Sequence, residues 1–451
     1  MSKAPATGKF TRGAISGLAL VHAGFNHLGH KARQLTRDEE DKLAAQEQHE
    51  AELGRILFRA LNQLKGTALK VSQLLSMEAD FLPVGIRREL AKGCYQVTPL
   101  NRAHIHKVFT REFGVAPDAV FAHFEANSFA AASLGQVHRA TLSDGTKVAV
   151  KVQYPGIASS IGSDIRMLQG ILHALALASD LIPRKELIDR VMHEIEHKLA
   201  EELDYEHEAE QLRWFNTFIW LPGVVIPQVM AAQSSRRVLT MQYLEGVHLD
   251  AWLATNPTQA QRDHFGQLLY DWFWHCVLVL GRIHADPHPG NFLFMDDGRL
   301  GLLDFGCTKH ISPEFCQAMA QAWSALLDEP SDDNYAQVRA AYLSLGVISP
   351  DLCLTDFIDQ LIPAITPIVN WQLEPFRHKE FNFSNKSGYP SPDLGHTKTL
   401  MNIAAGFHED LPYFDRAFLG LMHMLKKLGA TVVTGNPWVR NENNLPRSTN
   451  I

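Results

Sequence analysis

The chain has 451 residues, of which 46% are hydrophobic and 20% are charged, a composition typical of a soluble globular protein with more than one packed unit. Its formal net charge of -7 gives no overall positive field of the kind that binds nucleic acid, so a nucleic-acid partner is not expected. The five cysteines include no Cys-x-x-Cys pair, which argues against a zinc site or a disulfide framework and favours a reducing compartment.

The N-terminal segment is basic and contains a short apolar stretch. Its first 37 residues include no Asp or Glu, and Lys and Arg residues lie on both sides of the apolar residues 14–25. That stretch is too short to cross a hydrocarbon core of ~30 Å. A short apolar helix with basic ends suits contact with an anionic membrane surface. A disordered basic arm and a removable transit peptide are the alternatives.

Residues 37–81 have a helical pattern that is highly charged at first and apolar later. Lys70 and Gln73 lie one helical turn apart among leucines, so both project from an apolar face. Such side chains either contact an acidic cluster or extend to water.

Residues 136–142 and 147–153 predict two strands joined by a Ser-Asp-Gly-Thr turn. On the second strand the valines share one face, and Lys151 lies on the other. A Lys at the end of Val-Ala-Val-Lys is where a kinase-type strand directs its amine at nucleotide phosphates.

The loop expected before this hairpin is rich in alanine. Kinases have Gly-x-Gly-x-x-Gly there, because glycines let backbone N–H groups approach the phosphates. This chain instead has Ala131, Ala132 and Ser133, with a single glycine at Gly135. The alanine methyls should restrict that approach, so we expect nucleotide binding with an altered geometry.

Helices are predicted over residues 161–178 and 186–218. The second has a buried stripe beside an acidic run; the stripe consists of Leu187, Val191, Ile195, Leu199 and Leu203. In a kinase-like site one acidic residue should pair with Lys151. Helical period places Asp204 and Glu208 on one face and does not choose between them.

Residues 223–245 are rich in strand-forming side chains, and Met241–Glu245 is similar to the hinge between two lobes. A largely buried helix is predicted over residues 261–280, ending at Gly281.

The next stretch predicts a hairpin in which residues 292–295 and 300–303 flank an Asp-Asp-Gly turn. Pairing places Asn291 and Asp304 at the same open end, about 5 Å apart. Asp286 precedes Asn291 with the spacing of a phosphoryl-transfer catalytic loop, in which the Asp is the base and the Asn binds a metal. Asp304 opens an Asp-Phe-Gly sequence, whose carboxylate would hold Mg2+ against nucleotide phosphates.

Beyond Lys309 the pattern predicts mainly helices, interrupted by a polar loop over residues 372–398. No apolar run there reaches the ~18 residues of a transmembrane helix, so none is predicted. Residues 441–451 are predicted to be disordered.

Taken together, these motifs resemble the UbiB family of atypical kinase-like proteins over roughly residues 55–430. The matching stretches are Lys70–Gln73, AAASLGQVHRA at 130–140, VAVKVQYPG at 148–156, ELDYEHEA at 202–209, HADPHPGN at 284–291 and LLDFG at 302–306.

The resemblance implies an α+β, protein-kinase-like fold with two lobes, a helical N-terminal extension and a helix-rich C-terminal lobe. The expected domains are a membrane-contacting segment (1–36), the helical extension (37–115), an N-lobe with a helical insertion (116–246), the C-lobe (247–436) and a disordered tail (437–451).

The resemblance also implies roles for individual residues. Glu208 would be the glutamate that pairs with Lys151. Glu202 and Asp204 would form a Glu-x-Asp element that meets the Lys-x-Ser-Gln element of residues 70–73, so that the extension lies where a protein kinase takes its peptide. Ser72 stands where the family has glycine, which adds a side chain at a closely packed position.

The function implied is a magnesium-dependent ATPase or atypical kinase that supports ubiquinone (coenzyme Q) biosynthesis, with ATP and Mg2+ as cofactors. The expected location is the cytoplasmic face of a bacterial inner membrane, or the matrix side of the mitochondrial inner membrane in a eukaryote. Membrane lipids, quinone precursors and quinone-biosynthesis enzymes are the expected partners, with a homodimer as an open alternative.

Two other functions remain open at this point. One is a nucleotide-gated lipid-binding scaffold for quinone-biosynthesis enzymes, without essential catalysis, which the alanine loop and the covering extension favour. The other is a soluble small-molecule phosphotransferase of the antibiotic-kinase type, which also carries His-x-Asp-x-x-x-x-Asn but which the N-terminal extension disfavours.

Overall fold

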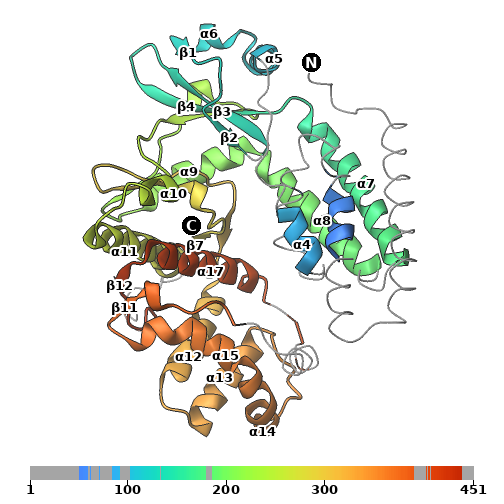
Figure 1. The fold of residues 1–451 in the computed structure, drawn as a ribbon, viewed down its shortest axis with the longest axis vertical. Helices are drawn as coiled ribbons and strands as arrows, with labels where there is room; N and C mark the ends of the chain where they lie inside the picture. Colours follow the sequence, from blue (N-terminus) through green and yellow to red (C-terminus); the bar gives the residue numbers. More distant parts are fainter. Residues whose placement is uncertain are drawn as a thin grey trace. The chain divides into compact units, whose positions relative to one another are not determined.

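The computed structural model forms two compact units (Figure 1). The first comprises Met1–Ala209 and Val229–Tyr243, and the second comprises Glu210–Gln228 and Leu244–Ile451. The residues that the structure describes are 50–58, 61, 71, 84–91, 102–132, 134–178, 185–390, 403, 405–406 and 408–438. The predicted membrane-contacting segment, Lys70, Ser72 and Gln73 of the Lys-x-Ser-Gln element, and residues 439–451 of the predicted tail lie outside these residues. Disorder was wrongly expected at Trp438, because this side chain is 4% exposed and its ring centroid lies 5.4 Å from that of Trp274.

The first unit contains a five-stranded antiparallel sheet. Its strands are β1 (His123–Phe124), β2 (Ala130–Ala132), β3 (Gly135–Thr141), β4 (Lys147–Gln153) and β6 (Val238–Gln242). The order is β1-β3-β4-β6, and β2 pairs with β3. The predicted hairpin of β3 and β4 is confirmed, and Gly145 in its turn has φ 87°, a conformation that favours glycine.

One face of this sheet packs against α5 (Arg102–Phe113), followed by the short α6 (Pro117–Val120). Val148, Val150 and Val152 are fully buried there, which confirms the predicted alternation along β4. The core of the sheet thus includes α5, which precedes residue 116, where the N-lobe was expected to begin.

Two long helices, α7 (Ile157–Ala178) and α8 (Lys185–Glu202), form a second core with residues 50–58 and with Ile86 of α4 (Val84–Ala91). Its residues on α8 include Ile188, Met192, Ile195 and Leu199, all fully buried. At the start of the helix the buried stripe is thus displaced by one residue from the predicted one, because Leu187 and Val191 are half-buried.

The prediction of one helix over residues 186–218 was wrong. The chain leaves α8 after Glu202, and α9 (Tyr205–Phe218) begins after two intervening residues. At the break, Asp204 accepts a hydrogen bond at Oδ1 from the backbone N–H of His207 (3.0 Å), which is the contact of a helix N-cap. Aspartate competes for backbone N–H groups and therefore favours a new helix start over continuation.

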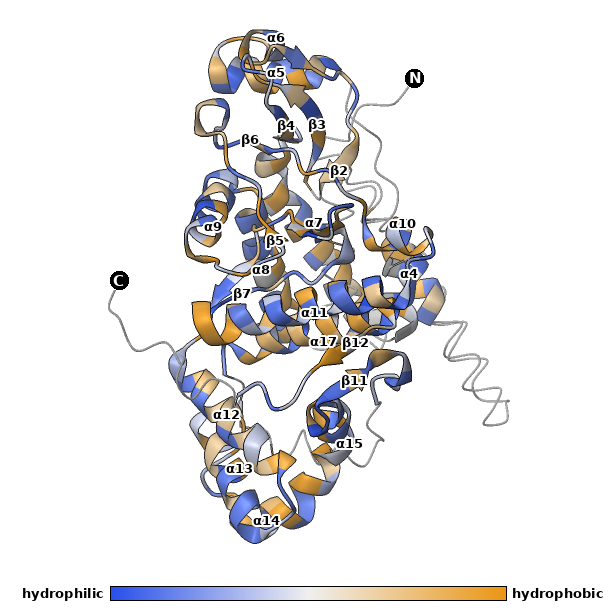
Figure 2. Ribbon diagram, turned by 90° about the vertical axis from the view of Figure 1, so that its left-hand side faces the viewer, coloured by the Kyte–Doolittle hydropathy of each residue, from blue (hydrophilic) through white to orange (hydrophobic). Residues whose placement is uncertain are grey.

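The second unit is mainly helical. Its α-helices among the described residues are α10 (Leu249–Leu253), α11 (Gln259–His275), α12 (Pro313–Leu327), α13 (Asp332–Ser344), α14 (Leu354–Asp356), α15 (Ile362–Leu373) and α17 (Leu411–Leu428). A π-helical turn continues α11 as far as Gly281, which has φ 58° and ends the helix as predicted. Both α11 and α17 carry hydrophobic as well as hydrophilic residues (Figure 2), and each buries several large apolar side chains in the interior of the second unit.

The described residues of the second unit also form three small sheets. In the first, β9 (Leu300–Leu302) pairs with β8 (Phe292–Phe294) in the predicted hairpin and, in parallel, with β5 (Val224–Val225). The second pairs β7 (Arg282–His284) with β10 (Thr308–His310).

The third sheet corrects the polar loop predicted over residues 372–398. Part of that stretch is β11 (Glu380–Asn382), which pairs with β12 (Thr431–Val433) and buries Phe381. Sequence pattern missed β11 because its partner strand lies about fifty residues away. Among the residues described, no helix has an apolar run long enough to cross a bilayer.

The close packing around Gly135, at the start of β3, predicts that an added side chain there would lower the free energy of unfolding. A Cβ at this position would lie 2.4 Å from the backbone oxygen of Val152 and 2.9 Å from the hydroxyl of Tyr205. We expect Gly135→Ala to lower the free energy of unfolding by about 2 kcal/mol, because backbone atoms cannot move aside as a flexible side chain would. Urea unfolding measures this change.

Gly170→Ala in α7 is the matched control, because the added methyl group would meet no atom within 4 Å apart from its chain neighbours and the backbone of its own helix. It should raise stability by about 0.5 kcal/mol through helix propensity. Equal unfolding midpoints for the two variants would show that the close approach at Gly135 is not tight.

Candidate nucleotide site

The segment between β7 and β8 places Asp286 and Asn291 in direct contact. The amide nitrogen Nδ2 of Asn291 donates to Oδ2 of Asp286 (2.9 Å) and to its backbone oxygen (3.1 Å). The backbone N–H of Leu303 donates to the backbone oxygen of Asn291 (3.0 Å), which extends the β8–β9 hairpin by one pair. Asn291 and Asp304 therefore leave the hairpin at its open end, as the sequence predicted.

Asp304 is held by a local turn and by a buried ring beside it. Its Oδ1 accepts from the backbone N–H of Gly306 (3.0 Å), an Asx turn. The next residue, Phe305, is fully buried, and its ring centroid lies 4.9 Å from that of Phe215. The Asp-Phe-Gly sequence is therefore anchored by its phenylalanine, which leaves the half-buried Asp304 in a fixed place.

His284 supports this arrangement, and the sequence did not reveal its role. It is buried on β7, and its Nε2 donates to the backbone oxygen of Asp304. This bond joins the strand that leads to Asp286 directly to the Asp-Phe-Gly sequence. The local signal was only the position of His284 two residues before Asp286, because its partner lies twenty residues later.

The side-chain oxygens of Asn291 and Asp304 are suitable ligands for a hard divalent cation. Because the nitrogen of the Asn291 amide donates to Asp286, its oxygen Oδ1 is the atom that can bind a metal. Together with the carboxylate of Asp304, this gives oxygen ligands of the kind that Mg2+ prefers. No cluster of three or more His, Cys, Asp or Glu ligands occurs among the described residues, and Mg2+ needs none when water and phosphate oxygens complete its shell.

Lys151 and Glu208 form a buried ion pair in the first unit. The Lys151 ammonium donates to both carboxylate oxygens of Glu208, at 2.7 and 2.8 Å, and the two side chains are 10% and 3% exposed. The ring of Tyr205 lies 5.3 Å from Nζ of Lys151. Helical period left Asp204 and Glu208 as equal partners, and the structure pairs Glu208 with Lys151 while Asp204 is exposed at the helix cap.

Gln153 is a second residue that the sequence did not single out. It lies two residues beyond Lys151 on the same face of β4 and is almost fully buried. Its Nε2 donates to the backbone oxygen of Leu203 (2.6 Å), at the break between α8 and α9, and to that of Arg236 (3.3 Å). Gln153 thereby holds the start of α9, and with it Glu208, against the sheet.

The alanine-rich segment is a strand, where a loop was expected. Ala131 pairs with Gln136 and Ala132 with Gly135, so β2 turns back tightly onto β3. Antiparallel pairing directs the backbone groups of alternate residues of β2 toward β3, so only part of this backbone is engaged by the sheet. Ser133 lies outside the described residues.

The predicted Glu-x-Asp element lies at the break between α8 and α9. Glu202 ends α8 and is half-buried, and Asp204 caps α9. Lys70 and Gln73, the residues expected to meet this element, lie outside the described residues, so their contact with it stays a prediction.

The predicted residues thus form two groups. Lys151, Glu208 and Gly135 belong to the first unit, and Asp286, Asn291 and Asp304 belong to the second. Arg416 joins the second group, because its Nη2 lies 3.3 Å from Oδ1 of Asp286. No sequence pattern pointed to Arg416, which is 130 residues from Asp286 along the chain.

Comparisons with known proteins identify the family of the domain that carries these motifs. Residues 94–338 match the model of the ABC1 atypical kinase-like domain. An uncharacterised protein of Synechocystis sp. is 31% identical over 330 residues, which cover 72% of this chain and 56% of that protein. The chloroplastic protein ACTIVITY OF BC1 COMPLEX KINASE 8 of Arabidopsis thaliana is 31% identical over 67% of this chain and 40% of its own length.

A solved structure from Mycobacterium tuberculosis, a protein in complex with erythromycin, is similar over 90% of this chain and 99% of that one, with a TM-score of 0.58 and 26% identity. The chain spans about half the length of the curated relatives it matches. The matched domain covers more than half of the chain and contains every residue of the two groups except Arg416. The chain therefore belongs to the ABC1 atypical kinase-like family.

Proposed function

We propose that this chain is an atypical kinase or ATPase that uses magnesium ATP. The observation that carries the proposal is the contact between Asp286 and Asn291 at the same hairpin end as Asp304. Phosphoryl transfer requires a base and a metal site. The carboxylate of Asp286 can serve as the base, and the amide oxygen of Asn291 and the carboxylate of Asp304 can bind the metal.

Each residue has a distinct role in this proposal. Asp286 accepts the proton of the attacking hydroxyl or water, and Asn291 and Asp304 supply metal ligands. Lys151, oriented by Glu208, contacts the nucleotide phosphates. Magnesium, when bound, neutralises the charge that develops on the phosphate oxygens. Backbone N–H groups near Ala131, Ala132, Ser133 and Gly135 complete the nucleotide contacts.

The biological role that we propose is support of ubiquinone biosynthesis at a membrane surface. It rests on the resemblance of the motifs to the UbiB family, and the kinase names of relatives support the kinase class alone. Lipids, quinone precursors and quinone-biosynthesis enzymes are the proposed partners. Glu202, Asp204, Lys70 and Gln73 are the proposed regulatory residues.

Cells that lack this chain provide the test of this role. We expect their quinone content to fall and quinone precursors to accumulate. The wild-type chain should restore both, and Asp304→Asn should restore neither because a neutral oxygen replaces an anionic metal ligand. Asp297→Asn, which changes an exposed carboxylate in the turn of the same hairpin, is the matched control and should restore both.

Two outcomes would contradict the proposal. An unchanged quinone profile in cells without the chain would remove the ubiquinone role. Full rescue by Asp304→Asn and Asp286→Asn, with loss of rescue by Lys151→Met, would instead identify a scaffold that needs bound nucleotide and no catalysis.

A further inference from the structure

Helix α17 touches the segment between β7 and β8, which carries Asp286 and is called the catalytic loop below, at two neighbouring points. The guanidinium of Arg416 pairs with Oδ1 of Asp286 at 3.3 Å, and the two side chains are 20% and 18% exposed. One turn later, Gly420 packs on Pro287: a Cβ at Gly420 would lie 2.1 Å from Cβ of this proline. Only glycine permits so close an approach, so the position of α17 is set by the residue that follows Asp286.

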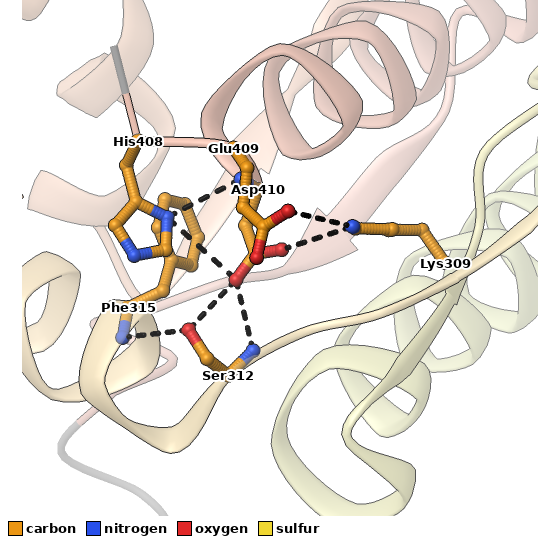
Figure 3. Close-up of polar contacts among 6 residues, drawn as sticks. All are labelled: Lys309, Ser312, Phe315, His408, Glu409 and Asp410. Carbon is orange, nitrogen blue, oxygen red and sulfur yellow. Dashed lines mark hydrogen bonds and ion pairs between the residues drawn. The ribbon is translucent and has the colours of Figure 1, made fainter.

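The N-terminal end of α17 is fixed to the segment that follows Asp-Phe-Gly (Figure 3). Asp410 is 2% exposed and accepts at Oδ2 from both the backbone N–H (2.9 Å) and the hydroxyl (2.7 Å) of Ser312. Lys309 lies 3.4 Å from Glu409 and 3.9 Å from the other oxygen of Asp410. The backbone N–H of Asp410 donates to Nδ1 of His408 (3.2 Å).

The contacts of Asp410 and Glu409 also connect the start of α17 to the catalytic loop. Lys309 lies on β10, which pairs with β7, and β7 ends two residues before Asp286. The helix is therefore attached to the catalytic segment on both sides of Arg416: through Asp410 at its start and through Gly420 beyond it. Because α17 is held at both Asp410 and Gly420, the backbone of Arg416 between them is fixed, and its guanidinium can sample few positions.

We propose that Arg416 is the positioning residue for the base Asp286, a proposal that rests on the proposed function above. Asn291 holds Oδ2 of Asp286 and Arg416 holds Oδ1, so the two contacts fix the rotation of the carboxylate plane. Proton transfer needs the acceptor oxygen within hydrogen-bond reach of the donor, and an unconstrained carboxylate samples that geometry only part of the time.

The first expected effect separates turnover from nucleotide binding. Arg416→Gln should lower kcat for magnesium-ATP turnover about 10- to 100-fold and leave the KM for ATP within about twofold, because Asp286, the residue that Arg416 contacts, acts as the base and is not a proposed nucleotide ligand. Arg416→Lys keeps a cation but loses the planar fork, so its kcat should lie between those of wild type and Arg416→Gln.

A double-mutant cycle tests whether Arg416 acts through Asp286. Asp286→Asn alone should lower kcat strongly, and adding Arg416→Gln to it should lower kcat by less than about twofold, because the partner carboxylate has already gone. Lys427→Gln is the matched control: it removes a cation from the same helix, one that pairs with Asp250, and should leave kcat unchanged.

The outcomes separate this inference from the proposed function. If Asp286→Asn leaves kcat at the wild-type value, the base is wrongly assigned and the proposed function fails. If Asp286→Asn lowers kcat but Arg416→Gln lowers it by the same factor in both backgrounds, the function stands and the positioning role of Arg416 is refuted. Equal kcat for Arg416→Lys and Arg416→Gln would refute it as well.

Discussion

Purified Asp304→Asn is expected to lose at least about 100-fold in magnesium-ATP turnover. This estimate corresponds to about 3 kcal/mol, the several kcal/mol that a metal ion contributes to stabilising a phosphoryl-transfer transition state. The substitution changes little besides charge: an asparagine Oδ1 can still accept from the backbone N–H of Gly306, so the Asx turn is kept. Release of ADP, followed while the Mg2+ concentration is varied, measures the effect.

The shape of the magnesium dependence adds a second readout. If Asp304 is a metal ligand, its loss should move half-maximal turnover to higher Mg2+ concentration, since one anionic oxygen ligand has been replaced by a neutral one. Asp297→Asn is the matched control, because Asp297 lies in the turn of the same hairpin and its carboxylate pairs with Arg299. Turnover by Asp304→Asn equal to that of Asp297→Asn would contradict the metal assignment.

The two hairpins show what short-range sequence information can determine. Each has an Asp-Gly turn between two runs of strand-forming residues, and both lie within two residues of their predicted bounds. A glycine with positive φ lies in each turn, and a turn of two or three residues pairs the flanking strands locally, so the hairpin can be recognised without a distant partner. The positions of Asn291 and Asp304 follow from the second hairpin, and the face of Lys151 follows from the first.

The contacts that escaped prediction join segments far apart in the chain. Arg416 meets Asp286 only because α17 packs on the catalytic loop, and β11 forms only because β12 lies beside it. The end of α8 is a different case, since its signal was local. Asp204 is a common helix cap, but the regular apolar pattern on both sides favoured one continuous helix.

That break also decides the partner of Lys151. On one continuous helix, Asp204 and Glu208 share a face, so helical period cannot tell them apart. In the structure Asp204 turns out to cap α9, which removes it from the face that Glu208 presents to Lys151. The motif resemblance named Glu208, and the cap at Asp204 provides the physical reason.

Glu208→Gln is expected to destabilise the first unit by about 3 kcal/mol. Lys151 is 10% exposed, and the substitution leaves its ammonium buried without the carboxylate that now binds it through both oxygens. Removing one partner of a buried pair is costly because the remaining charge has lost its compensation. Urea unfolding measures the loss, and ATP affinity should fall with it, because Lys151 loses the contact that orients it.

Removing both charges should be less damaging than removing one. Lys151→Met combined with Glu208→Gln leaves no buried ammonium, so its free energy of unfolding should exceed that of Glu208→Gln alone, although neither variant should bind ATP well. Glu206→Gln is the matched control, since it changes an exposed glutamate in the first turn of the same helix and should alter stability by less than about 0.5 kcal/mol. If Glu208→Gln and Glu206→Gln unfold at the same urea concentration, the ion pair of Lys151 and Glu208 does not hold α9 to the sheet. The position of α9 must then depend on the hydrogen bond from Gln153 to Leu203.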